Sequence, residues 1–115
     1  ILYLITPESF SKMHRVRSDE IFHFYLGDAV EMLQLYLDGG SETVIMGTDI
    51  KAGDLQQLTV KRGIWQGIKL KDGGKFALLG CTVSPGFEFE DYQPGVLEEL
   101  VKTYPDQKEL IEKYF

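Results

Sequence analysis

The sequence predicts an all-β domain, a barrel or sandwich of short strands, followed by two short helices. Runs rich in β-branched and aromatic residues recur about every ten positions, as in sandwiches and barrels. Clusters of Gly, Asp, Pro and Ser separate these runs. After residue 96 the apolar spacing changes to that of a helix.

Nine segments have the composition of strands. They are 1–5, 12–16, 20–26, 30–37, 42–47, 55–60, 63–70, 75–83 and 87–92. Glycine and aspartate between them tolerate the backbone conformations of tight turns, so 38–40 and 72–74 are predicted to close hairpins. From Val96 onward a first helix is expected, Pro105 ends it, and Asp106 with Glu109 predicts a capping box for a second helix.

The length of 115 residues fits one domain, 1–115, with the barrel over 1–93 and the helices over 94–115. The net charge is −6 and the twelve Lys and Arg residues are scattered, which argues against a nucleic-acid partner. No apolar run reaches the about 18 to 20 residues of a membrane span, so no membrane partner is expected. A single cysteine, Cys81, is typical of a buried thiol in a reducing compartment, which predicts a cytoplasmic protein.

The stretch HRVRSDEIFHFYLGD, residues 14–28, carries both histidines of the chain. Strand alternation places Glu20, Phe22 and Phe24 on one face and His23 on the other. If residues 12–26 form a hairpin with His14 and Glu20 on the same side, an imidazole and a carboxylate meet in an apolar interior. Arg15 and Arg17 share the face opposite His14, where solvent or an interface is expected.

The later intervals in this stretch resemble the first signature of the cupins, which is a glycine, five residues, H-x-H, three or four residues, Glu, six residues and Gly. Here His14-Arg15-Val16 is followed by Glu20 and Gly27 at the matching intervals. The second signature, P-x-G-x-x-H, is similar to KRGIWQ at 61–66. Val16 and Gln66 stand where cupins have two of their histidines.

The resemblance extends over nearly the whole chain and is to a branch of cupins once described as putative relatives of sugar epimerases. It implies a double-stranded β-helix (a jelly-roll barrel similar to RmlC), commonly paired into a homodimer, with His14, Glu20 and Gln66 at the barrel mouth. Members of that branch usually carry an N-terminal segment with a proline-glycine-glycine-aromatic stretch, so the abrupt start at Ile1 suggests that an upstream segment is missing.

Three functions stay open at this point. The first is a metal-free epimerase or isomerase, in which His14 supported by Glu20 is the catalytic base. The second is a binding module without catalysis. The third is a metal-dependent enzyme with a divalent ion at His14, Glu20 and Gln66; we expect no tightly bound metal, because two strong ligands and a neutral amide seldom hold one.

The expected ligand is a small polar metabolite such as a sugar or a nucleotide sugar. The candidate binding residues are Gln66, Phe22, Phe24, His23 and Trp65, in addition to the pair His14 and Glu20. Two of these are at odds with simple alternation. His23 could contact the ligand only if it faced inward, whereas alternation places it on the outer face. Alternation also places Trp65 on the outer face, where it would pack against another layer or subunit instead of the ligand.

Overall fold

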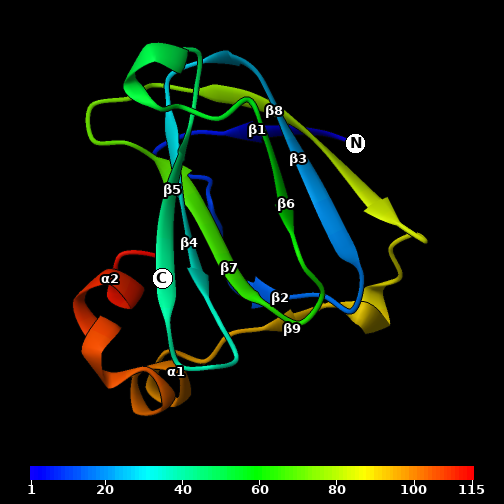
Figure 1. Ribbon diagram of the computed structural model, residues 1–115, viewed down its shortest axis with the longest axis vertical. Helices are drawn as coiled ribbons and strands as arrows, with labels where there is room; N and C mark the ends of the chain where they lie inside the picture. The colour runs from blue at the N-terminus through cyan, green and yellow to red at the C-terminus, as the bar shows by residue number, and fades with distance from the viewer.

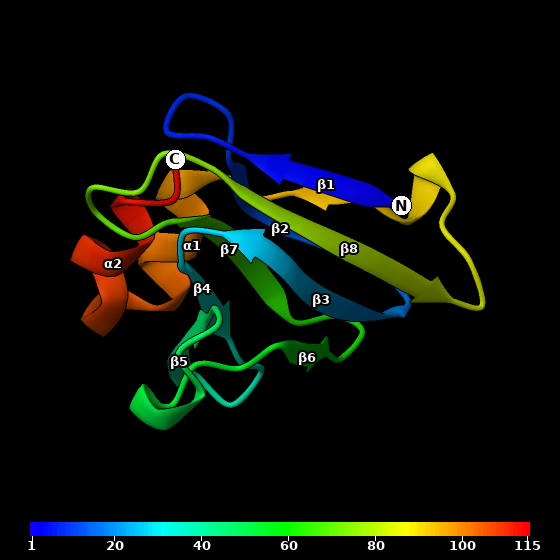
Figure 2. The same ribbon diagram turned by 90° about the horizontal axis from the view of Figure 1, so that it is seen from above.

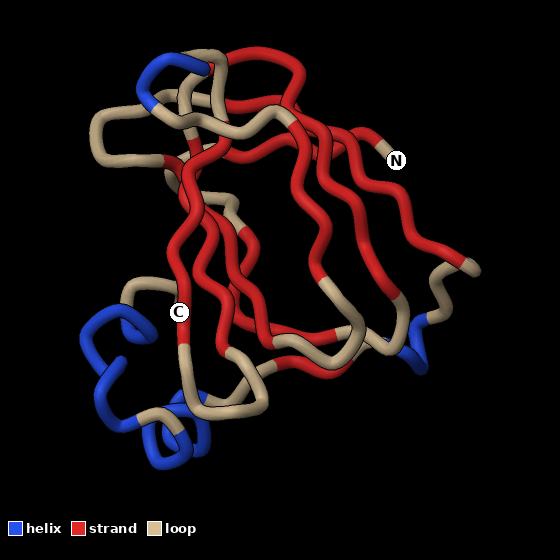
Figure 3. Tube along the Cα trace, viewed as in Figure 1, coloured by secondary structure: helices blue, strands red, loops and turns tan.

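The computed structural model describes residues 1–115 and contains nine strands and five short helices. The strands are β1 (Leu2–Ile5), β2 (Ser11–Arg15), β3 (Asp19–Gly27), β4 (Val30–Leu35), β5 (Ser41–Met46), β6 (Gln57–Val60), β7 (Trp65–Leu70), β8 (Ala77–Ser84) and β9 (Gln93–Pro94). The helices are η1 (Ile50–Ala52), η2 (Phe89–Asp91), α1 (Leu97–Thr103), η3 (Pro105–Gln107) and α2 (Lys108–Glu112). Figure 3 shows that strands make up most of the molecule and that the helical segments lie at its periphery.

The strands form two antiparallel sheets that face each other. One sheet has the order β1-β8-β3-β6 and the other the order β5-β4-β7-β2-β9. Figures 1 and 2 show the two sheets as the walls of a barrel. Consecutive strands often lie in different sheets, so the chain crosses repeatedly between the walls, as a jelly-roll barrel requires.

Alternation along β3 fills the barrel interior as the sequence predicts. Glu20, Phe22 and Phe24 are buried, whereas Ile21 and His23 are partly exposed on the outer face. The inward residues join a core of twelve buried side chains, namely Ile5, Phe22, Phe24, Val30, Met32, Met46, Val60, Ile68, Leu70, Ala77, Leu79 and Cys81. Full burial of each large apolar side chain contributes roughly 1.5–3 kcal/mol, so this interior is the main source of stability.

The C-terminal helices cover the outer face of the five-stranded sheet (Figure 1). A second buried cluster joins them to that sheet and consists of Met13, Leu33, Leu35, Leu100, Tyr104, Ile111 and Tyr114. The inner strand β4 is buried on both faces, and four of the six residues in its sequence VEMLQL are apolar. None of the helices is long and apolar enough to traverse a bilayer.

Two predicted elements differ in the structure. Residues 87–92 contain η2 instead of a strand, because Ser84-Pro85-Gly86 ends β8 and leaves this segment no strand to pair with. Here the Glu88 backbone N–H donates to Asp91 Oδ2 at 3.2 Å, which favours the helical turn. The second C-terminal helix has no capping box at Asp106, because Pro105 begins the separate turn η3 and α2 starts at Lys108.

The predicted hairpins also have different outcomes. Residues 36–40 do join the paired strands β4 and β5, and Gly39 adopts a positive φ of 92° in that turn. Residues 72–74 instead connect β7 with β8, which belong to opposite sheets. The predicted hairpin between β2 and β3 does not form for the same reason, since β2 pairs with β7 and β9 while β3 pairs with β6 and β8.

Candidate ligand site in the barrel

The two sheets enclose a cavity of about 770 Å³ at one end of the barrel. Its lining comes mainly from β1, β2, β8 and the segment between β8 and β9, and consists of Ile1, Tyr3, Phe10, Ser11, Lys12, His14, Val16, Glu20, Cys81, Thr82, Val83, Phe87 and Tyr92. Most of these side chains are apolar or aromatic, and a few polar groups converge among them. Small-molecule sites commonly have this make-up and this size.

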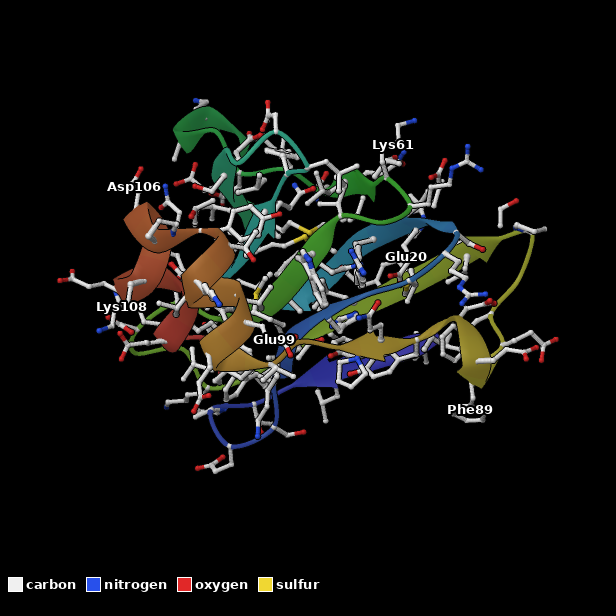
Figure 4. All side chains as sticks on the ribbon, turned by 90° about the horizontal axis from the view of Figure 1, so that it is seen from below. Glu20, Lys61, Phe89, Glu99, Asp106 and Lys108 are labelled. Atoms are coloured by element: carbon white, nitrogen blue, oxygen red, sulfur yellow. The ribbon has the colours of Figure 1, made fainter.

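Glu20 is the buried carboxylate of the cavity, with a relative exposure of 7%. Figure 4 shows it between the two sheets. Gln66 Nε2, on the opposite sheet, donates a hydrogen bond to Glu20 Oε1 at 2.6 Å, and Cys81 Sγ donates to Glu20 Oε2 at 3.1 Å. Both carboxylate oxygens therefore have a donor, which offsets the several kcal/mol that burial of an isolated charge costs.

The thiol of Cys81 stays protonated in this environment. Burial, and secondly the hydrogen bond to Glu20, raise the pKa of Cys81 to about 12. A thiol beside a carboxylate in a buried position is a donor and not a nucleophile. Cys81 thus supports Glu20 and is not itself a candidate for covalent chemistry.

His14 presents one ring nitrogen to the cavity. Nδ1 lies 2.8 Å from the carbonyl oxygen of Lys12, which can only accept, so Nδ1 carries the proton of the neutral ring. The ring also stacks on Tyr92, with 5.1 Å between the centroids. Nε2 has no hydrogen-bond partner in the protein. Every fully buried side-chain nitrogen or oxygen of the chain has a partner, so Nε2 is not fully buried. Its lone pair is therefore free and accessible from the cavity that His14 lines.

His14 and Glu20 line the same cavity, but no hydrogen bond joins them. They belong to opposite sheets and approach the cavity from its two walls, which corrects the predicted meeting across a hairpin. The backbone of Lys12, and not Glu20, fixes the tautomer of His14. The imidazole and the carboxylate are therefore two separate polar groups that face one ligand volume.

The other predicted binding residues do not line this cavity. Gln66 lies beneath Glu20 at 1% exposure, and Phe22 and Phe24 belong to the apolar core. His23 stacks on Tyr25 outside the barrel. On the other sheet Trp65 also faces outward, where the Arg15 guanidinium lies 4.5 Å from the centre of its ring.

Tyr3 and Tyr92 are lining residues outside the predicted set of binding residues. Burial raises the pKa of the Tyr3 hydroxyl, so it is protonated at neutral pH. Alternation in ILYLI could have placed Tyr3 on the face of the buried Ile5, although it could not show which face lies inside. No local signal pointed to Tyr92, because 87–92 has the pattern of a strand and the structure turns it back over the cavity mouth.

The donor set does not fit the divalent metal that the cupin resemblance implies. Of His14, Glu20 and Gln66, only the first two are strong ligands, and each Glu20 oxygen already accepts a hydrogen bond from Gln66 or Cys81. Gln66 turns its Nε2 donor and not its oxygen toward the carboxylate. No group of three or more His, Cys, Asp and Glu residues is arranged to hold a metal ion.

Sequence comparison places the chain among known proteins. A family model described as the cupin superfamily (DUF985) matches residues 1–94. "Uncharacterized protein YML079W" of Saccharomyces cerevisiae is 31% identical over 96 residues, which cover 80% of this chain and 47% of that protein. The chain therefore spans about half the length of this relative.

Structural comparison gives the same fold. Protein SO0799 from Shewanella oneidensis is similar with a TM-score of 0.91 and 32% identity, over 98% of this chain and 71% of that chain. A dTDP sugar isomerase from Desulfovibrio desulfuricans G20 has a TM-score of 0.71 at 13% identity, over 84% of this chain and 62% of that chain, a likeness that shows the fold alone. The jelly-roll barrel, the motif at 14–27 and the matching family model agree, and the chain belongs to the DUF985 family of the cupin superfamily.

Proposed function

We propose that this protein binds a small polar metabolite, a sugar or a nucleotide sugar, in the barrel cavity and isomerises or epimerises it without a metal. The observation that carries the proposal is the free Nε2 of His14, which faces the same apolar-walled cavity as the carboxylate of Glu20. A single accessible base in a largely apolar pocket is the arrangement that proton abstraction requires.

The walls of the cavity suit a sugar. Tyr3, Phe10, Phe87 and Tyr92 offer aromatic surfaces, against which the C–H face of a sugar ring can pack. Ligand hydroxyls can donate to the carboxylate of Glu20, which is held in place by Gln66. The dTDP sugar isomerase with the same fold adds support for this class of ligand.

The proposed reaction moves a proton at a carbon next to a carbonyl group. His14 Nε2 takes the proton from one side, and the Tyr3 hydroxyl returns one from the other. The two residues come from different sheets, β2 and β1, and both line the cavity. His14 gains and Tyr3 loses one proton per turnover, and exchange with solvent restores both groups.

A panel of sugars and nucleotide sugars tests the binding step. A ligand that binds the folded state raises the melting temperature in proportion to its occupancy. We expect His14→Ala to remove the ligand-dependent rise, whereas the matched control His23→Ala, on the outer face, retains it. An unchanged rise in His14→Ala would place the ligand elsewhere.

Incubation of a binding ligand in D₂O tests the chemical step. Proton abstraction by His14 predicts deuterium at one carbon of the ligand, detected by mass spectrometry, and no deuterium with His14→Ala. Binding without deuterium incorporation would instead indicate a module that binds its ligand without catalysis.

We also propose a homodimer formed by the outer face of the four-stranded sheet. No helix covers this face, and Leu2, Leu4 and Tyr25 are 72%, 58% and 53% exposed on it. A second copy would bury these side chains, which monomers rarely expose together. Light scattering of the wild type and of Leu2→Lys/Leu4→Lys tests this, with a dimer expected only for the wild type.

A cytoplasmic location is part of the same proposal. It is supported by the one cysteine, which is free and buried.

A further inference from the structure

All three arginines of the chain line one polar pocket beside the barrel cavity. The pocket has a volume of about 590 Å³ and is lined by Arg15, Val16, Arg17, Arg62, Gly63, Glu90, Asp91, Tyr92 and Gln93. It shares Val16 and Tyr92 with the barrel cavity, so the two spaces adjoin at the mouth. The chain is acidic overall, with a net charge of −6, yet all three of its arginines contribute to the lining of this one pocket.

Backbone contacts bring the arginines together from two loops. Arg17 follows β2, and Arg62 lies in the turn between β6 and β7. The Gly63 N–H donates to the carbonyl oxygen of Val16 at 2.9 Å, and the Arg62 N–H donates to Asp19 Oδ1 at 2.8 Å. Gly63 has a φ of +79°, which a residue with a side chain would adopt only with strain. The two loops are thus fixed side by side.

The guanidinium groups are not neutralised within the protein. Glu90 and Asp91 line the same pocket, but no carboxylate lies within 4.0 Å of any arginine nitrogen, and the one ion pair of the chain joins Lys69 to Glu31. Asp91 instead accepts the backbone N–H of Glu88. Arg15 is oriented by a 2.8 Å hydrogen bond from its Nε to Gln93 Oε1 and by the Trp65 ring.

We infer that this arginine pocket binds the phosphoryl groups of the ligand, and that the ligand class is a nucleoside diphosphate sugar or another phosphorylated sugar. The inference rests on the proposed function, since it assumes that the sugar lies in the barrel cavity. Guanidinium groups suit phosphate oxygens because their planar N–H donors form paired, charge-assisted hydrogen bonds. The adjoining pockets allow one molecule to place its sugar among Tyr3, His14 and Glu20 and its phosphates between Arg17 and Arg62.

Inorganic pyrophosphate, titrated calorimetrically at low ionic strength, probes the arginine pocket alone. We expect Arg17→Gln/Arg62→Gln to weaken pyrophosphate binding at least about tenfold. The reason is that the variant loses charge-assisted hydrogen bonds to the phosphate oxygens. Lys51→Gln on η1, at the other end of the barrel (Figure 1), removes an exposed charge and should leave the affinity unchanged.

UDP-glucose then separates the two proposals. Weaker binding of UDP-glucose in both the double arginine variant and His14→Ala supports both. A loss in the arginine variant alone upholds the phosphate pocket and contradicts the barrel site. The phosphate pocket is overturned if the wild type does not bind pyrophosphate, or if the arginine variant binds it as the wild type does. It is equally overturned if Lys51→Gln weakens binding to the same extent, since the attraction would then be one of overall charge.

Discussion

Gln66 and Glu20 form a buried hydrogen bond of 2.6 Å that joins the two sheets across the barrel interior. Gln66 occupies the position where the second cupin signature has a histidine. In this chain the side-chain nitrogen of Gln66 donates to the Glu20 carboxylate. The pair Gln66 and Glu20 thus lies as a buried polar contact next to the barrel cavity.

The Gln66–Glu20 pair should show strong energetic coupling. Glu20→Ala and Gln66→Ala each leave a buried polar partner unsatisfied, whereas the double variant removes both groups. A double-mutant cycle of urea unfolding should therefore give a coupling energy of about 1–3 kcal/mol. Additive effects of the two changes would show that the pair contributes nothing specific.

Cys81 should be unreactive toward thiol reagents in the folded protein. Its pKa is raised from 9.0 to about 12, so almost no thiolate exists at pH 8. Labelling with a chromogenic disulfide reagent should proceed only as fast as the protein opens, and denaturant should accelerate it strongly. Rapid labelling without denaturant would contradict the burial of this thiol.

The same thiol should make the folded state less stable in alkali. Because the pKa of Cys81 is higher in the folded state, its contribution is fully present below about pH 9 and is lost as the pH rises toward about 12. Tyr36, whose pKa is also raised to about 12, adds to the same trend. Comparison with Cys81→Ala isolates the thiol, since this variant should lose less stability than the wild type between pH 8 and pH 11.

His14 should have its proton on Nδ1 when the ring is neutral. The carbonyl oxygen of Lys12 accepts that proton at 2.8 Å, which leaves Nε2 as the basic nitrogen. Long-range ¹H–¹⁵N NMR spectra distinguish the two tautomers by their nitrogen shifts. A neutral ring protonated at Nε2 would remove the proposed base.

Gly67 should tolerate no side chain, because the side chains of Met13 and Tyr114 pack directly on it. A Cβ at this position would lie 2.7 Å from Met13 Sδ and 3.1 Å from Tyr114 Cδ2, both of which are buried. We expect Gly67→Ala to lower the free energy of unfolding by about 1–3 kcal/mol. Gly80→Ala is the matched control, because a Cβ at this position meets the side chain of the exposed Tyr25, which can move away. Urea unfolding should therefore show a smaller decrease in the free energy of unfolding for Gly80→Ala than for Gly67→Ala.

The pattern of strands and helices was largely predictable because its determinants are local. Alternation along β3 correctly separated Glu20 and Phe22 from His23, and the change of spacing after Val96 located the first helix. The segment 87–92 was predicted wrongly because alternating Phe and Glu also occur where the chain has no strand to pair with. Strand pairing is a long-range property, and for the same reason the hairpin between β2 and β3 was wrong.

The site was predictable only in part. Spacing identified His14 and Glu20, which do line one cavity. It could not show that Lys12 and Tyr92 orient His14, because a backbone carbonyl and a distant aromatic ring leave no pattern around residue 14. Nor could it show that Arg62 joins Arg15 and Arg17, since these residues meet only when the turn at 61–64 packs against the end of β2.

The two histidines allow the most direct test of the barrel site, because His14 faces the cavity and His23 lies outside the barrel. Selective ¹⁵N-histidine labelling and titration with UDP-glucose report on both in one sample. The site described here predicts that the Nε2 resonance of His14 shifts with saturation while both nitrogens of His23 stay in place. Saturable binding that leaves His14 unchanged, or that shifts only His23, would contradict it.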